Sequence, residues 1–171
     1  QGRYEEAKRL LTTGVKQATE LYGPESSFLV TQHDTLADLH TSAGEFEAAR
    51  GEFEERLRLS AIIYGVDSLN HSMGLHNYGA LQVKRGDIDK AESLFRRAIE
   101  IRMQRLGEDA PMTLRGQVSL AELLIEQERM QEAGELLRRA ERGLSVKLPA
   151  DAPARFEAGW ALAKWHVLEG N

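Results

Sequence analysis

Glycines recur at one fixed spacing in this chain, and much of the sequence repeats with them. Gly2, Gly44 and Gly86 lie 42 residues apart, and Glu128 takes the fourth place in the series. Three further columns recur in the same register, namely Tyr4, Phe46, Ile88 and Met130; Ala7, Ala49, Ala91 and Ala133; and Leu11, Phe53, Phe95 and Leu137. A period of this length predicts stacked copies of one structural unit, each burying its apolar face on its neighbours.

One period of the sequence reads as a helical hairpin. Apolar or small residues recur at spacings of three and four within 73–83 and again within 88–106, which is typical of two amphipathic helices. Gly86 lies between the two stretches, where glycine can adopt a left-handed cap, and Asp87 is a suitable N-cap for the second helix. Gly107 ends that helix, and Pro111 suits the first turn of the next one.

Repeating this plan along the chain predicts helices throughout and no strand. We expect a single array over 1–171, made of a lone second helix at 2–22, hairpins at 27–64, 69–106 and 111–148, and a lone first helix at 153–169. Both ends fall at the middle turn of a repeat, so we expect the chain to be an excerpt from a longer protein. Glu128 stands at a turn position occupied elsewhere by glycine, which predicts a local cost if a left-handed residue is needed there.

Composition narrows the classes of function. Charged residues make up 29% of the chain and the formal net charge is −5, which argues against a nucleic-acid partner. No apolar run approaches the roughly 18 residues that cross a bilayer, and no Lys/Arg-rich face suits a membrane surface, so we expect no membrane partner. The absence of cysteine excludes disulfides and thiolate metal sites, and it fits a cytoplasmic location.

The histidines do not form a metal-binding pattern. His33 and His40 are seven residues apart, and His71 and His76 are five apart, whereas a helical zinc pair needs a spacing of about four. No phosphate-binding glycine loop, serine elbow or nucleophilic cysteine is present. We therefore expect no catalytic residue, no metal and no cofactor, and we predict that the protein is not an enzyme.

The repeated residues resemble the tetratricopeptide repeat (TPR) family. Its pattern of small residue, turn glycine, aromatic or apolar residue and alanine is present as Gly79, Gly86, Ile88, Ala91, Phe95 and Ala98, and as Ala37, Gly44, Phe46, Ala49 and Phe53. The period of 42, longer than the common repeat of about 34, and the segment at 98–111 are similar to the kinesin light chain variety. The resemblance implies an all-α, right-handed superhelical solenoid of antiparallel helix pairs, which binds a protein or peptide ligand.

The resemblance also implies where a ligand would bind. First helices line the concave face in this family, which selects Asp34, Asp38, Met73, His76, Asn77, Val83, Arg115, Val118, Glu122, Trp160 and Lys164 as candidate peptide-binding residues. Asn77 matches an asparagine common in the kinesin light chain type, where such amides bind a ligand's backbone, and an amide can donate and accept together.

Two sets of apolar first-helix residues allow two interpretations. Val83, Ile125 and Val167 align at one repeat position, and Val118 and Trp160 align at another. Either these side chains form the apolar floor of a groove, or they pack between neighbouring first helices. The sequence leaves both interpretations open.

The leading functional prediction is a non-catalytic protein–protein interaction scaffold that binds a peptide or protein segment on the concave face. The alternative is a regulatory or self-association segment of a larger multidomain signalling protein, such as a bacterial kinase or nucleotide-switch protein, since arrays of the resembling type accompany such domains. Trp160 and Trp165 lie on a last helix with no second helix to cover it, and apolar surface of this kind favours self-association through the truncated repeat ends.

Overall fold

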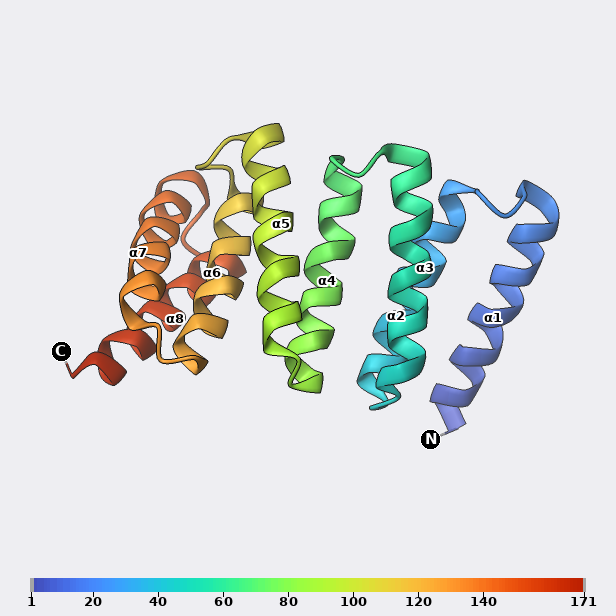
Figure 1. Ribbon diagram of the computed structural model, residues 1–171, viewed down its shortest axis with the longest axis horizontal. Coiled ribbons are helices and arrows are strands. Elements are labelled where there is room, and N and C mark those ends of the chain that lie inside the picture. The colour runs from blue at the N-terminus through green and yellow to red at the C-terminus, as the bar shows by residue number, and fades with distance from the viewer. Residues whose placement is uncertain (1, 171) are drawn as a thin grey trace. The chain divides into compact units, whose positions relative to one another are not determined.

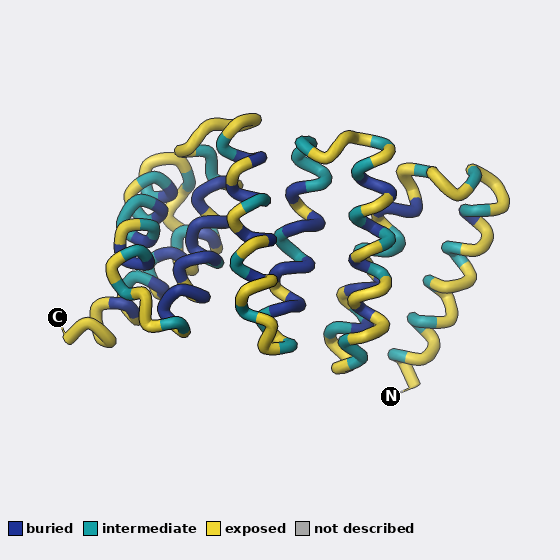
Figure 2. The backbone as a smooth tube through the Cα atoms, viewed as in Figure 1, coloured by how far each residue is buried: buried dark blue, intermediate teal, exposed yellow. Residues whose placement is uncertain are grey.

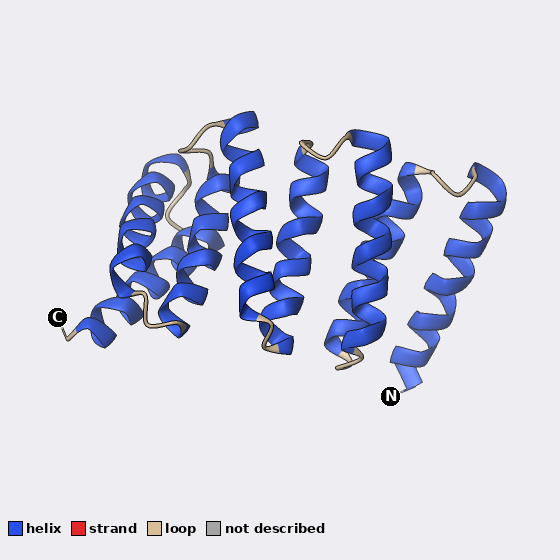
Figure 3. Cartoon of the chain, viewed as in Figure 1, coloured by secondary structure: helices blue, strands red, loops and turns tan. Residues whose placement is uncertain are grey.

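The computed structural model describes residues 2–170, so Gln1 and Asn171, the outermost residues of the expected array, lie outside the described residues. Residues 2–170 form eight α-helices and no strand (Figures 1 and 3). The helices are α1 (Gly2–Tyr22), α2 (Ser27–Ser42), α3 (Phe46–Tyr64), α4 (Leu69–Arg85), α5 (Ile88–Leu106), α6 (Pro111–Glu126), α7 (Met130–Lys147) and α8 (Pro153–Glu169). The predicted all-α class is confirmed.

The chain divides into two compact units, residues 1–91 and 92–171. In the first unit α1 packs on α2, α2 on α3, and α3 on α4. In the second unit, which includes most of α5, α7 packs on both α6 and α8, and α6 also contacts α8. Figure 2 shows that buried positions lie on the sides where helices of the same unit face each other. Burial in each unit therefore arises mainly between consecutive helices, with a further contact between α6 and α8. The grouping of all helices into one array with truncated ends stays a prediction.

The middle turns close with the hydrogen bonds of a Schellman motif. Gly86 has φ 78° and ψ 11°, its amide donates to the carbonyl of Val83 at 3.0 Å, and the amide of Asp87 donates to the carbonyl of Gln82 at 3.0 Å. This left-handed conformation is open to glycine without steric cost. Gly44 makes the same turn with φ 77°. The turn that the 42-residue period predicts is therefore present at both glycines.

Glu128 adopts the same left-handed conformation as these glycines, with φ 60°. Its amide donates to the carbonyl of Ile125 at 3.0 Å, and the amide of Arg129 donates to the carbonyl of Leu124 at 2.9 Å. These two hydrogen bonds are the same as those of the glycine turns. A non-glycine residue in this region costs about 1–2 kcal/mol because Cβ approaches the following carbonyl oxygen. The backbone strain that the sequence predicts at this turn is therefore present at Glu128.

Helix starts also follow from the local sequence. The hydroxyl of Ser68 accepts a hydrogen bond from the amide of His71 at 3.0 Å, and the carboxylate of Asp87 accepts one from the amide of Lys90 at 3.3 Å. Each of these bonds satisfies a backbone donor that has no partner within the helix. The predicted role of Asp87 as an N-cap is confirmed.

A packing device that the sequence analysis missed joins α3 to α4. The side chain of Arg56 is only 2% exposed, and its Nη1 donates to the carbonyl oxygen of Asn70 at 2.8 Å. Gly74, four residues after that carbonyl, provides the space: a Cβ there would lie 2.0 Å from Nη1 of Arg56. The absence of one side chain on α4 therefore creates a notch that holds the guanidinium from α3.

Two further notches of this kind occur in the second unit. Arg102 is 4% exposed, donates to the carbonyl of Met112 at 3.3 Å, and lies against Gly116, where a Cβ would be 3.0 Å from Nη1. Trp165 is 5% exposed, and its ring lies against Gly134, where a Cβ would be 2.5 Å from Cζ2. Its indole Nε1 donates to the carbonyl four residues before that glycine, at 2.7 Å. In all three cases a large side chain with an N–H donor fills a glycine notch and donates to the carbonyl exposed there.

Candidate functional site

A polar cluster joins α2, α3 and α4 of the first unit. Asp34 on α2 accepts a hydrogen bond from Nδ2 of Asn77 on α4 at 3.3 Å, and its carboxylate lies 3.3 Å from Nε of the buried Arg56. Burial lowers the pKa of Arg56, and the negative charge of Asp34 opposes that change. The three side chains connect α2, α3 and α4, so the amide of Asn77 is held in a defined position.

A small hollow lies next to this cluster. Its volume is about 170 Å³, and it is lined by Asp38, Thr41, Phe53, Asn77, Ala80, Leu81 and Lys84. Burial raises the pKa of the Asp38 carboxyl, and the charge of Asp34 raises it further, while Lys84 lowers it. The hollow therefore presents an acid, an amide and a base above the buried ring of Phe53, a combination suited to polar recognition.

The other candidates in this unit are accessible to different degrees. Met73 is 42% exposed on the second turn of α4. His76, Asn77 and Val83 are partly buried along the same helix. Met73 thus adds an accessible apolar side chain one helical turn from Asn77.

The second unit carries a different set of charges on α6 and α8. Arg115 is exposed, and its Nε lies 3.9 Å from the carboxylate of Glu157. Burial raises the pKa of Glu122, and the positive charge of Lys164 acts in the opposite direction. Trp160 is 67% exposed on α8. The sequence-selected residues of this unit therefore combine accessible charges with one accessible aromatic ring.

The aligned apolar residues are not equally accessible. Val118 and Ile125 on α6 are only 6% and 7% exposed, whereas Val167 on α8 is 77% exposed. The burial of Val118 and Ile125 favours packing between helices over a ligand-facing role at these two positions. Trp160 and Val167, at the equivalent positions of α8, remain open to solvent.

The described part of the chain holds neither a cluster of metal ligands nor a candidate membrane span. Over residues 2–170, no three His, Asp or Glu side chains lie close enough together to hold a metal ion. Nor does any helix in that range combine the length and apolar character that a membrane span requires.

The paired helices, their Schellman turns and the charged first-helix faces define a helical-repeat protein. A family model, the tetratricopeptide repeat, matches residues 63–145, a little under half of the chain. No curated protein matches the sequence. The family match and the solved structures that share this fold confirm the resemblance to kinesin light chain-like tetratricopeptide repeats.

Among the solved structures that share this fold are two forms of one repeat protein and another repeat protein. One is a protein of nearly identical TPR-like repeats from Podosopora anserina, described as a kinesin light chain. It superposes on this chain with a TM-score of 0.79 at 21% identity, and the match covers 99% of this chain and 80% of that one. A single-substitution variant of those repeats gives a TM-score of 0.81 at 21% identity, with the same coverage. BtubC (BKLC) from P. vanneervenii gives a TM-score of 0.77 at 25% identity, covering 88% of this chain and 61% of that one. The chain thus has the fold of tetratricopeptide repeat solenoids, which generally mediate protein–protein interaction.

Proposed function

We propose that the chain is a non-catalytic scaffold whose first helices bind a peptide or protein segment. The observation that carries this proposal is the hollow between α2 and α4 with the fixed amide of Asn77 at its edge. Nδ2 of Asn77 is engaged by Asp34, whereas Oδ1 has no protein partner among the described residues and is free to accept an amide from a ligand's backbone. Met73 offers an apolar contact beside it. Placement of the protein in the cytoplasm remains a prediction.

Peptides selected on the wild-type protein from a random display library would test this groove. Asn77→Ala removes the positioned amide, and Met73→Asp places a charge on the apolar contact, so we expect each to weaken binding of the selected peptides about tenfold or more. Affinities would be measured by titration calorimetry, with circular dichroism to verify that the helices are intact.

Ile62→Asp is the matched control. Ile62 is 51% exposed on α3, a second helix, so this substitution introduces the same charge at a similarly exposed apolar residue away from the hollow. Its binding should equal that of the wild type. Equal losses in all three variants, or no loss in any, would exclude groove binding by these first helices.

A second candidate function is self-association, which a specific apolar surface favours. Phe156, Trp160, Val167 and Leu168 on α8 are between 57% and 77% exposed, and the last three line a hollow of about 290 Å³ together with Ala163 and Lys164. Such a surface suits a partner helix. Sedimentation velocity over a concentration series should show association that Trp160→Glu abolishes. A wild-type protein that stays monomeric at every concentration would eliminate this candidate.

A further inference from the structure

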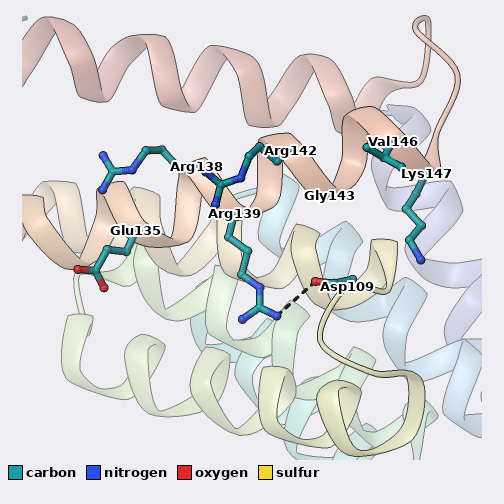
Figure 4. Close-up of a pocket in the computed structure, with 8 residues that line it drawn as sticks. All are labelled: Asp109, Glu135, Arg138, Arg139, Arg142, Gly143, Val146 and Lys147. Carbon is teal, nitrogen blue, oxygen red and sulfur yellow. Dashed lines mark hydrogen bonds and ion pairs between the residues drawn. The ribbon is translucent and has the colours of Figure 1, made fainter.

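α7 carries a basic hollow that shares no lining residue with the hollow between α2 and α4. It has a volume of about 700 Å³ and is lined by Asp109, Glu135, Arg138, Arg139, Arg142, Gly143, Val146 and Lys147 (Figure 4). Four cations therefore face two carboxylates in a chain whose overall charge is −5. A local excess of the opposite sign marks a surface that attracts acidic partners.

Much of this positive charge is not neutralised by the protein. Arg139 forms ion pairs with Glu108 and Asp109, the contact drawn in Figure 4 being the one to Asp109. Arg142 and Lys147 make no ion pair with any described residue. Glu141, the one carboxylate within residues 138–147, does not line the hollow. Arg142 and Lys147 are thus available to a ligand.

The base of the site is well ordered by packing. The guanidinium of Arg138 lies 5.0 Å from the ring centroid of Trp165, which is a cation–π contact. Trp165 is itself buried and fixed by its hydrogen bond from Nε1 at 2.7 Å. The aromatic ring restrains Arg138 without consuming its charge, so less conformational entropy is lost when an anion binds.

An apolar side chain completes the surface. Val146 is 82% exposed, one helical turn beyond Arg142 on α7. Arg138, Arg142 and Val146 are spaced by four residues each, so they follow one another along the helix at steps of about 6 Å. An extended segment places alternate side chains on one face at about 6.6 Å. The two spacings match closely enough for side chains at alternate positions to meet the three residues in turn.

We propose that this hollow binds an extended acidic protein segment with the pattern Glu-x-Glu-x-Leu, in which x is any residue. The two carboxylates contact Arg138 and Arg142, and the leucine contacts Val146. This orientation keeps the carboxylates away from the last carbonyls of α7, where the negative end of the helix dipole disfavours anions. Lys147, at the end of the helix, adds long-range attraction that speeds association and weakens with salt.

Fluorescence anisotropy with a labelled peptide, Gly-Glu-Ser-Glu-Ser-Leu-Gly, tests the proposal on the whole chain. We expect saturable binding at low salt. Replacing both glutamates by glutamine should weaken it about tenfold or more. Arg142→Glu should have an effect of the same size, and Val146→Ser a smaller one. Arg142→Gln, which removes the positive charge without introducing a negative one, provides a second variant should Arg142→Glu disturb the fold.

Lys16→Glu is the matched control for Arg142→Glu. Lys16 is exposed on α1, and both substitutions change the net charge by the same amount. It should bind the peptide like the wild type, as should Asn77→Ala. The proposal would be overturned by no binding up to about 1 mM peptide, by equal binding of the peptide with both glutamates replaced by glutamine, or by an equal loss of affinity in Lys16→Glu. It would also be overturned if an equally charged oligonucleotide displaced the peptide equally well from the wild type and from Val146→Ser. Affinity that changes with protein concentration would instead assign the surface to a second copy of the chain and would also overturn it.

Discussion

Gly74→Ala should destabilise the protein, although alanine is the better helix former. In an exposed helix interior the change from glycine to alanine stabilises by about 1 kcal/mol. At this position the new Cβ would lie 2.0 Å from Nη1, 2.7 Å from Cζ and 2.9 Å from Cδ of Arg56. The side chain of Arg56 therefore has to leave its notch, because three of its atoms would otherwise overlap with the methyl group.

The cost follows from what Arg56 gives up. Its hydrogen bond to the carbonyl of Asn70 has a charged donor, and such bonds contribute about 1.5–3 kcal/mol. The contact with Asp34 is lost as well, which adds to the cost. After subtraction of the gain in helix propensity, we expect Gly74→Ala to lower the free energy of unfolding by about 1–2 kcal/mol.

The assay is urea denaturation followed by circular dichroism, with Gly51→Ala as the control. Gly51 is a helical glycine of α3 with nothing within 4 Å of its potential Cβ, so alanine should stabilise there by up to about 1 kcal/mol. A double-mutant cycle isolates the clash: in the background of Arg56→Ala, Gly74→Ala should become neutral or stabilising by up to about 1 kcal/mol, which corresponds to a coupling of about 1–3 kcal/mol. If Gly74→Ala stabilises the wild type as Gly51→Ala does, the notch does not hold Arg56 and the reasoning is refuted.

Three further predictions concern single residues. Hydrogen bonds from Tyr4, Lys8 and His40 lower the pKa of Glu45 from 4.5 to about 2. Because the pKa of Glu45 is lower in the folded state, the carboxylate stabilises the fold fully above pH 4.5, and this stabilisation is lost as the pH falls towards 2. The difference in melting temperature between the wild type and Glu45→Gln should therefore shrink over that interval. A difference that stays constant with pH would contradict this prediction. Glu128→Gly should raise the free energy of unfolding by about 1 kcal/mol by relieving the left-handed strain, measured by urea denaturation, and a loss of stability would count against that assignment. Gly134→Ala should destabilise the protein by about 1–3 kcal/mol, because the new methyl group clashes with the ring of Trp165. Gly159→Ala should not destabilise it, because the space around Gly159 is open. If thermal melting shifts equally in the two variants, the ring of Trp165 is free to move away.

The sequence predicted the helical elements well because each turn is specified locally. Gly44 and Gly86 mark left-handed caps that only glycine adopts readily, and their φ values near 78° show why the spacing was informative. Even the exception was predictable, since Glu128 stands in the same register and takes the same conformation. Local backbone chemistry is visible in a single sequence, whereas the packing of distant side chains is not.

The glycine notches illustrate the part that could not be predicted. Arg56 lies in register with Ala98 and Ala140, 42 residues apart, so the sequence shows it only as a departure from an alanine position. Gly74 and Gly116 are themselves 42 residues apart, which was a usable signal, but their partners Arg56 and Arg102 occupy register positions one helical turn apart. A search for equivalent residues in each repeat therefore could not pair them. The same limit applies to Val118, whose burial depends on the neighbouring helices.

These notches also account for a property that the repeated residues cannot supply. The turn caps and the alanine columns are alike from one repeat to the next, so a helix packed against the wrong neighbour would satisfy them almost as well. Arg56 fits α4 only because Gly74 is there, and Trp165 fits α7 only because Gly134 is there. A side chain that needs a glycine notch penalises packing on a helix that lacks one, since its donor would be buried without a hydrogen-bond partner or its atoms would clash with a Cβ. The repeated residues thus stabilise the stacking of helices in general, and the irregular pairs disfavour pairings with helices that lack a glycine notch.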